Sequence, residues 1–507
     1  MSKFMLGLLS AAFGGAALAD PPEDLFLALI AGPAVSPPTQ FMYTFNAVFN
    51  MTALRAPAQS IVLNLPTGVN VVVPLETFQP RAGYLFYDID GDQIDEIVVD
   101  PSAQPEDFSW RWYGRAQGWT VALTTERGVI AGRISGPNGN YAVTPRNGHV
   151  ELGKVNSDHW KTHEEDTDAA ASTVRSDTRA ARSVPWIPAS WNRSCPGSLP
   201  NANASSVIDV LVMYTSGTLV NNGDTEAGVR AVVQAAIDDA NQSLRNSLVN
   251  TVTFSLRGVE FVGGTFNYDG TGIDNALYTF GGFRPSASDP YMTFPGNAYV
   301  QSRRNSQWAD IVALARTPGD GTCGVSMIQR VTTAGYAYEP GADFEKFAYL
   351  VFNPACGPDR LNLAHELGHG MGMEHDPRNS ETSQLSGYDP SCPWSYGHRR
   401  PLGPDGYRFR TVMAYWQQGE GGGGPGGCAS NASCPVIDAY SQPAMVWANY
   451  ALYPLGLNDP NAQPIGVATP TATQAAAKGF DTLSRLAPVV EAFRARPDSI
   501  FANGFQF

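Results

Sequence analysis

The chain has 507 residues, enough for about two to four domains of ordinary size. Hydrophobic residues make up 43% of it and charged residues 16%, which is typical of a folded globular protein. The formal net charge is −14, and this acidic balance argues against nucleic acid or an anionic membrane surface as a partner.

Residues 1–19 have the pattern of a secretory signal peptide. Lys3 supplies the positive start, residues 4–18 are apolar or small, and residues 17–19 (ALA) fit a cleavage site. The alternative is a membrane anchor, but the apolar run is short for a span. The sequence therefore predicts a secreted protein, extracellular or periplasmic, that is monomeric and has no membrane span in its mature form.

The next two segments differ sharply in composition. Residues 20–158 contain short β-branched runs at 60–65, 70–73, 118–123 and 128–134, which predict a β-rich, propeptide-like domain. Residues 159–200 place Arg175, Arg179 and Arg182 among small polar residues, a composition typical of an exposed linker. We expect proteolytic processing in this linker, and an uncut linker is the alternative.

From residue 201 to residue 495 the pattern becomes α/β. Apolar runs predict strands at 208–214, 252–256, 309–314 and 347–352, and apolar residues at helical spacing predict a long helix over 225–247. A helix over 361–371 carries a histidine motif. A last helix is expected within 475–494, where Pro488 starts or kinks its second half. Residues 496–507 form a short tail.

Three of the seven histidines lie within eleven residues. On a helix, His365 and His369 project from one face, one turn apart. Gly372 lies where a helix commonly ends and the chain turns with a positive φ, so His375 can return to the same metal. Three imidazoles leave the fourth position of Zn²⁺ open, which is the arrangement of a catalytic rather than a structural site.

Glu366 follows the first of these histidines and lies just off the ligand face. A carboxylate there can take a proton from the attacking water as general base and pass it to the leaving amine. The sequence thus predicts a zinc metalloendopeptidase that acts on proteins or peptides. The alternatives are an extracellular calcium-binding or adhesion protein with a non-catalytic zinc site and a zinc-binding inhibitor, and the intact Glu366 argues against both.

The segment HELGHGMGMEH at 365–375 resembles the H-E-x-x-H-x-x-G-x-x-H motif of the metzincins. TVMAYW at 411–416 resembles their Met-turn, so the resemblance gives Met413 the role of a floor beneath the metal. Asp376, directly after the third histidine, is typical of the reprolysin-like (adamalysin) branch. The secreted bacterial peptidyl-Asp metalloendopeptidases look most similar, and the resemblance covers about 207–416.

The resemblance also implies a fold and a second catalytic group. The fold is an α/β metzincin-like domain with a twisted, mostly parallel sheet, a long backing helix, an active-site helix and an irregular C-terminal subdomain. In serralysins and astacins a tyrosine two residues after the methionine approaches the metal, and Tyr415 has that offset. It either donates a hydrogen bond to the oxyanion or packs under the site.

Six cysteines in an exported chain favour disulfides. Cys323 and Cys356 flank the strand before the active-site helix, and we expect them to pair. Cys392 is expected to pair with Cys428 or Cys434. Cys195 is either a disulfide partner or a latency switch at the open metal position, and the odd number that a switch would leave favours the disulfide.

Two charged segments remain. Asp88, Asp90, Asp92 and Asp95 place carboxylates at alternating loop positions that suit Ca²⁺, which takes six to eight oxygen ligands. A solvated acidic turn is the alternative. Arginines 399, 400, 408 and 410 predict either a solvated basic loop or a basic wall of the cleft that favours acidic substrates.

Overall fold

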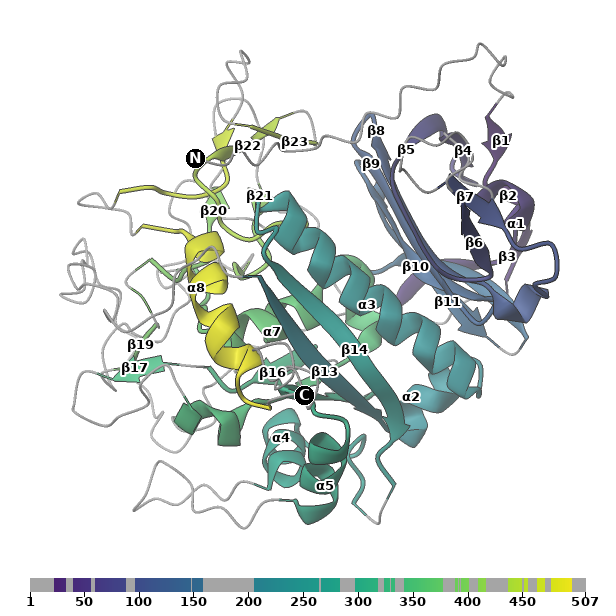
Figure 1. The fold of residues 1–507 in the computed structure, drawn as a ribbon. Coiled ribbons are helices and arrows are strands. Elements are labelled where there is room, and N and C mark those ends of the chain that lie inside the picture. The colour runs from purple at the N-terminus through teal and green to yellow at the C-terminus, as the bar shows by residue number, and fades with distance from the viewer. Residues whose placement is uncertain are drawn as a thin grey trace.

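The computed structural model contains two β-sheet units with one long helix between them and further helices around the second sheet (Figure 1). The described residues are 22–32, 40–55, 60–87, 96–146, 148–157, 205–263, 266–282, 297–317, 323–328, 330–332, 342–376, 388–390, 392, 394–400, 409–415, 436–448, 451–454, 463–469 and 476–494. Within them no helix is both long and apolar enough to cross a membrane.

The N-terminal unit is a ten-stranded sheet in the order β1-β4-β5-β8-β9-β10-β11-β12-β3-β2. Only β1 and β4 pair in parallel. The strands are β1 Glu23–Asp24, β2 Phe26–Ala31, β3 Phe41–Phe49, β4 Ser60–Asn64, β5 Asn70–Ala82, β8 Ser109–Ala116, β9 Trp119–Glu126, β10 Val129–Gly136, β11 Gly139–Arg146 and β12 His149–Val155. A short helix α1 (Met51–Arg55), the turn η1 (Pro105–Asp107) and the hairpin β6 (Tyr84–Tyr87) and β7 (Glu96–Val99) accompany the sheet.

Tight turns fix the register of the central hairpins of this sheet. Gln117 and Gly118 join β8 to β9 with φ of 49° and 81°, and Arg127 and Gly128 join β9 to β10 with φ of 48° and 76°. Two successive positive φ angles give the turn whose twist matches that of antiparallel strands. One face of the sheet then buries its own apolar core, which includes Trp110, Trp112 and Leu123.

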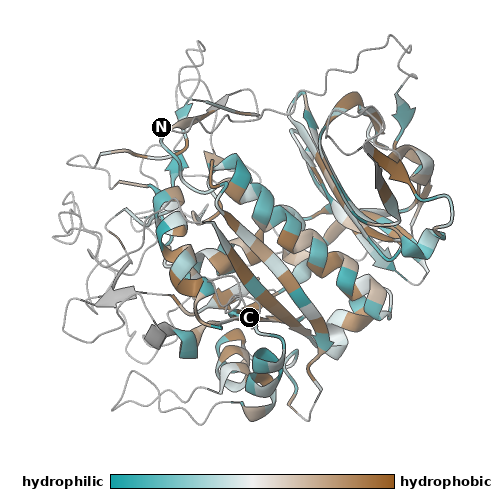
Figure 2. Cartoon of the chain, viewed as in Figure 1, coloured by the Kyte–Doolittle hydropathy of each residue, from teal (hydrophilic) through white to brown (hydrophobic). Residues whose placement is uncertain are grey.

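The second unit is built on a five-stranded sheet in the order β14-β13-β15-β18-β16. Its strands are β13 Ser206–Tyr214, β14 Val252–Phe261, β15 Ile311–Ala315, β18 Tyr349–Phe352 and β16 Gly324–Ser326. All pair in parallel except the edge strand β16, which is antiparallel to β18. In Figure 2 the hydrophobic colour is dense along β13, as expected for a strand buried on both faces.

Helix α3 (Glu226–Asn246) backs this sheet, and it confirms the long helix expected over 225–247. The Thr225 side chain caps its first turn by accepting from the Gly228 N–H at 3.0 Å. Its apolar side, with Val229, Val233 and Ile237, joins the core of the parallel sheet. The mostly parallel sheet with α3 and the histidine-bearing helix α7 (Asn362–Gly370) fits a metzincin-like fold.

The opposite side of α3 faces the N-terminal sheet, so the helix lies between the two sheets (Figure 1). Ala231 and Ala235 meet Ala131 there. Around this small apolar contact, Arg133 of β10 forms buried ion pairs with Asp239 at 2.9 Å and with Asp438 at 3.2 Å.

The remaining helices are α2 (Ser216–Asn221), α4 (Ile273–Gly281), α5 (Ala298–Ser306), α6 (Gly357–Arg360) and α8 (Gly479–Glu491), with the turns η3 (Ala342–Phe347) and η4 (Pro354–Cys356). Helix α8 packs along β13 and contains Pro488 without ending there. The C-terminal part also has short paired strands, β17 Arg330–Thr332 with β19 Tyr388–Pro390, β20 Arg399–Arg400 with β21 Phe409–Arg410, and β22 Met445–Ala448 with β23 Ala451–Pro454 and β24 Gln463–Pro464.

Candidate functional site

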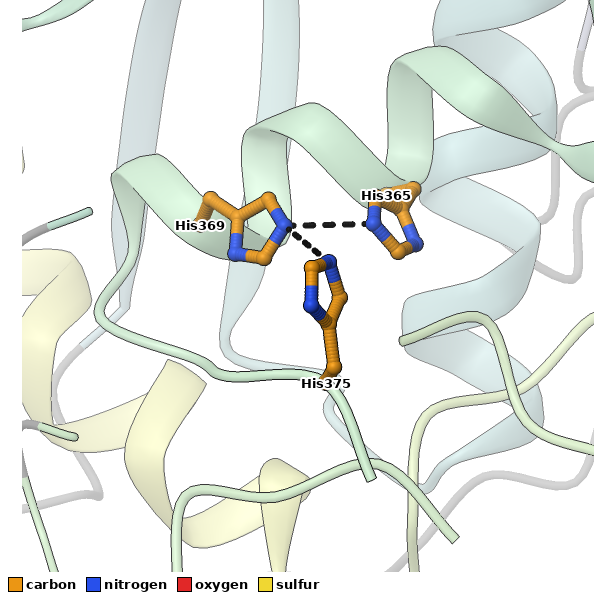
Figure 3. A group of neighbouring side chains, drawn as sticks. All are labelled: His365, His369 and His375. Carbon is orange, nitrogen blue, oxygen red and sulfur yellow. Dashed lines mark hydrogen bonds between the residues drawn. The ribbon is translucent and has the colours of Figure 1, made fainter. Parts of the chain in front are cut away.

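The site is built on α7, which begins after Leu361 and carries the first two histidines of the motif. His365 and His369 are buried, and they lie one turn apart on the same face of the helix, as their spacing predicted (Figure 3). Their Nε2 atoms are 3.1 Å apart. The helix therefore delivers two imidazole nitrogens to one point.

The chain turns back directly after α7. Gly372 has a φ of 84°, which is the left-handed conformation that its position predicted, and its N–H donates to the His369 carbonyl at 2.8 Å. The Met373 N–H donates to the Gly368 carbonyl at 2.9 Å. This turn brings His375 beneath the helix, with its Nε2 3.1 Å from that of His369 (Figure 3).

The hydrogen bonds of the outer ring nitrogens show why these residues fit a metal. His365 Nδ1 lies 2.8 Å from the Val412 carbonyl oxygen, and His369 Nδ1 lies 2.8 Å from the Met373 carbonyl oxygen. A carbonyl only accepts, so each Nδ1 carries the proton and each Nε2 presents a lone pair. Two such lone pairs at 3.1 Å repel each other, and a cation between them removes the repulsion. The three histidines could therefore bind a metal.

The floor of the site is the segment 411–415. Met413 is fully buried beneath α7. A Cβ at Gly368 would overlap the Met413 sulfur and lie 3.3 Å from its Cε, so only glycine lets the methionine approach the helix this closely. The same segment supplies the Val412 carbonyl that orients His365.

Tyr415 lies against the histidines. Its ring centroid is 4.0 Å from that of His375 and 5.7 Å from that of His365. Its hydroxyl is buried, with no hydrogen-bond partner among the residues that the structure describes. The ring thus packs on His375 and His365, and its hydroxyl is a hydrogen-bond donor without an acceptor in the described residues.

Asp376 and Arg399 hold the backbone of Tyr415. The Tyr415 N–H donates to the Asp376 carboxylate at 3.2 Å, and the Arg399 guanidinium donates to the Tyr415 carbonyl at 3.4 Å. Arg399 also forms an ion pair with Asp376 at 3.6 Å. Asp376, the residue after His375, is therefore connected to the segment 411–415 both directly and through Arg399.

These contacts correct both interpretations of the arginine segment. The side chains of Arg399, Arg400 and Arg410 are largely buried, and Arg410 donates to the Ala414 carbonyl at 3.0 Å. Burial of these three side chains is at odds with a solvated loop and with an exposed basic wall. The Asp376 carboxylate and the Tyr415 carbonyl pair with Arg399, and the Ala414 carbonyl accepts from Arg410. Residue 408 lies outside the described residues.

Glu366 is buried on α7 beside the edge strand β16, with 3% of its surface exposed. Gly324, the first residue of β16, lies directly against its carboxylate. The expected disulfide between Cys323 and Cys356 is confirmed, with a Cα–Cα distance of 5.6 Å, and it fixes the chain just before Gly324.

Sequence reasoning missed Tyr440, which is hydrogen-bonded to the backbone of α7. Its hydroxyl donates to the Ala364 carbonyl at 2.6 Å, and its N–H donates to the Ser247 hydroxyl at 2.7 Å. Burial raises the pKa of Tyr440, so the phenol stays protonated and remains a donor. No local motif marks this residue, because its partners are 76 and 193 positions away.

Several predicted sites cannot be compared with the structure. Asp88, Asp90, Asp92 and Asp95 lie outside the described residues, so calcium binding there stays a prediction. Cys195, Cys428 and Cys434 lie outside them as well. Cys392 is disulfide-bonded.

The segment that carries this geometry matches a known protein family. Residues 204–421 match the family model Reprolysin_5, described as Metallo-peptidase family M12. The match supports a metallopeptidase, a hydrolase that acts on peptide bonds in proteins or peptides. It does not favour the calcium-binding or adhesion alternative. No curated protein matches the chain.

Two solved structures show weak similarity to the chain. One is a structure of a chaperone-substrate complex, with a TM-score of 0.34 and 16% identity over 58% of this chain and 36% of that one. The other is the crystal structure of metalloproteinase-II from Bacteroides fragilis, with a TM-score of 0.28 and 12% identity over 62% of this chain and 81% of that one. This chain thus spans about a third of the first structure's length, and neither TM-score supports a detailed comparison.

Proposed function

We propose that this metallopeptidase is a secreted zinc-dependent endopeptidase of the reprolysin-like branch. One observation carries the proposal: three buried histidines direct their Nε2 atoms to one point, two of them with Nδ1 bonded to backbone carbonyls, beside a buried glutamate. Structural zinc sites have four protein ligands, whereas catalytic sites have three and keep one position for water or substrate.

His365, His369 and His375 would hold the zinc ion. When bound, the ion supplies Lewis-acid chemistry that acidifies a water molecule and polarises the peptide carbonyl. Glu366 accepts the proton of the attacking water and donates it to the leaving amine. Its burial keeps bulk water away from this proton transfer.

Tyr415 is proposed to stabilise the oxyanion. Its hydroxyl is buried without a partner in the described residues, and its ring rests on His375, so a substrate oxygen near the ligands is the acceptor it lacks. Met413 supports the ligands from below as a packed floor, and Asp376 fixes the backbone of Tyr415.

The N-terminal domain, residues 20–158, is proposed to be a propeptide that is separated by cleavage within 159–200. In the described residues its contacts with the peptidase domain lie along α3, around η4 and α6, and at Asp438, and the printed contacts include none with His365, His369 or His375. The leader at 1–19 and the disulfide between Cys323 and Cys356 support an exported protein.

The test is hydrolysis of casein and of a quenched fluorogenic peptide by the secreted protein, after its N-terminus has been sequenced. We expect activity that o-phenanthroline abolishes and zinc restores. Glu366→Ala should lower kcat by at least about a thousandfold while zinc content stays at one ion per chain. The control is Glu226→Ala, which removes an exposed carboxylate of α3 and should leave kcat unchanged. A processed protein that binds zinc and cleaves neither substrate would contradict the proposal.

A further inference from the structure

The edge strand β16 meets the active-site helix at one glycine. A Cβ added at Gly324 would overlap the Oε1 atom of Glu366 and lie 2.8 Å from both its Cγ and its Cδ. Real Cβ atoms essentially never approach other heavy atoms this closely. The backbone of Gly324 therefore forms one wall of the space that the Glu366 carboxylate occupies.

The conformation of Gly324 does not explain why glycine stands there. Its φ lies outside the left-handed region that favours glycine, and an ordinary residue would adopt it without strain. Space is the remaining reason. A side chain at this position would force the carboxylate of Glu366 to move or the strand to withdraw from α7.

The strand cannot withdraw easily, because three contacts hold the residue before Gly324. Cys323 is tied to Cys356 by the disulfide. Its carbonyl accepts from the Asn353 N–H at 2.6 Å and from the side-chain amide of Asn362 at 2.9 Å. Asn362 is buried, it begins α7 three residues before His365, and its amide also donates to the Asn353 carbonyl at 2.7 Å.

We propose that Gly324, held by the Cys323–Cys356 disulfide and the Asn362 amide, is a positioning residue that fixes the Glu366 carboxylate for proton transfer. The inference rests on the proposed function, since the purpose of a fixed carboxylate is the general-base role. A general base must lie within hydrogen-bond reach of the proton that it takes, and a displacement of about 1 Å can cost a hundredfold in rate.

A double-mutant cycle on thermal stability tests the contact without using activity. We expect Gly324→Ala to lower the Tm of the full chain by about 3 °C or more, because the extra methyl overpacks a restrained site. In the Glu366→Ala background the atoms it would strike are gone, so the same change should shift Tm by less than about 1 °C. If Gly324→Ala alone does not fold, recovery of folded protein in the double variant gives the same answer.

The matched control is Gly370→Ala at the end of α7. A Cβ there meets only the Ile311 side chain, at an ordinary 3.7 Å, so Tm and kcat should stay near those of the unmodified chain. Equal Tm losses from Gly324→Ala with and without Glu366 would overturn the proposal. The cycle measures stability and not activity, so it gives a result even if the chain proves not to be a peptidase. Failure of the Gly324 proposal can therefore be told apart from failure of the proposed function.

Kinetics of the processed protein then test the role. Gly324→Ala should lower kcat at least about tenfold, with KM and zinc content unchanged. Asn362→Ala adds no atoms to the site and should lower kcat in the same way by releasing Cys323. A rise in KM alone in both variants would show that β16 acts on substrate binding instead, and would overturn the positioning role.

Discussion

The docking of the N-terminal sheet on α3 leads to a prediction about one arginine. Arg133 is buried and places its guanidinium 2.9 Å from the Asp239 carboxylate and 3.2 Å from that of Asp438. Burial by itself would raise the pKa of Asp438, but the neighbouring arginines, Arg133 above all, outweigh burial and hold that pKa below its usual value. Replacing Arg133 with Met keeps most of the apolar stem and leaves two buried carboxylates without this cation.

The expected loss in the free energy of unfolding follows from the burial of the two carboxylates. Removing one partner of a buried ion pair costs about 3–5 kcal/mol, because the remaining charge stays desolvated. The Tyr113 hydroxyl still donates to Asp438 at 3.1 Å, so we expect the low end, about 3 kcal/mol at pH 7. The matched control is Arg485→Met on α8. Its ion pair with Asp481 is partly exposed, with 38% of the arginine side chain accessible, and such pairs contribute about 0–1 kcal/mol.

Equilibrium unfolding of the full chain in urea, followed by tryptophan fluorescence, measures the difference. Trp110 and Trp112 lie in the core of the N-terminal sheet and report on its unfolding. We expect Arg133→Met to unfold this sheet at a clearly lower urea concentration than either the unmodified chain or Arg485→Met. If the two variants unfold together, the buried pairs contribute no net stability and the reasoning is refuted.

Two further predictions concern the site, and a third concerns His398, whose backbone N–H donates to the Thr411 hydroxyl at 2.8 Å. Tyr415→Phe should lower kcat about a hundredfold with metal content unchanged, as expected for the loss of one oxyanion donor, and unchanged turnover would reject a catalytic role. Gly368→Ala should lower Tm by about 3 °C or more by pushing Met413 away from α7, whereas Gly370→Ala should not, and calorimetry compares them. Burial lowers the pKa of His398 to about 4, so the folded chain should lose stability as the pH falls from about 6.5 to 4. His398→Gln should lessen this loss of stability when unfolding is measured across the same pH range. Equal loss in the variant and the unmodified chain would contradict the prediction.

The elements that the sequence predicted are those with a local pattern. The strands at 206–214 and 311–315 are nearly continuous apolar runs, because both faces of a parallel sheet are buried. The histidines and Gly372 were predictable because a helix and one left-handed turn fix their relative positions within eleven residues. Periodicity and spacing are enough to predict a structural feature when the residues that form it are close together in the sequence.

The contacts that the sequence did not reveal join residues far apart. Gly324 meets Glu366 across 42 positions, and nothing near Gly324 in the sequence indicates that its missing side chain matters. Arg399 was expected at the surface because arginine usually is, but it pairs with Asp376, which is also buried. Such pairs depend on tertiary packing, which no local pattern encodes.

The two sides of α3 support the proposal that the N-terminal domain is removable. The two large apolar cores share no residue, and the apolar clusters that join the units are small, one of them placing Phe41 and Val155 against Cys356. Where α3 faces the N-terminal sheet, its side chains are mostly small or polar, with Ala235, Asp238 and Asp239 in the contact and Val232 partly buried beside them. Loss of the sheet would expose mainly carboxylates and alanines, which water tolerates, whereas loss of a large apolar contact would leave a surface prone to aggregation. An interface of this kind suits a domain that leaves after processing better than one that stays for stability.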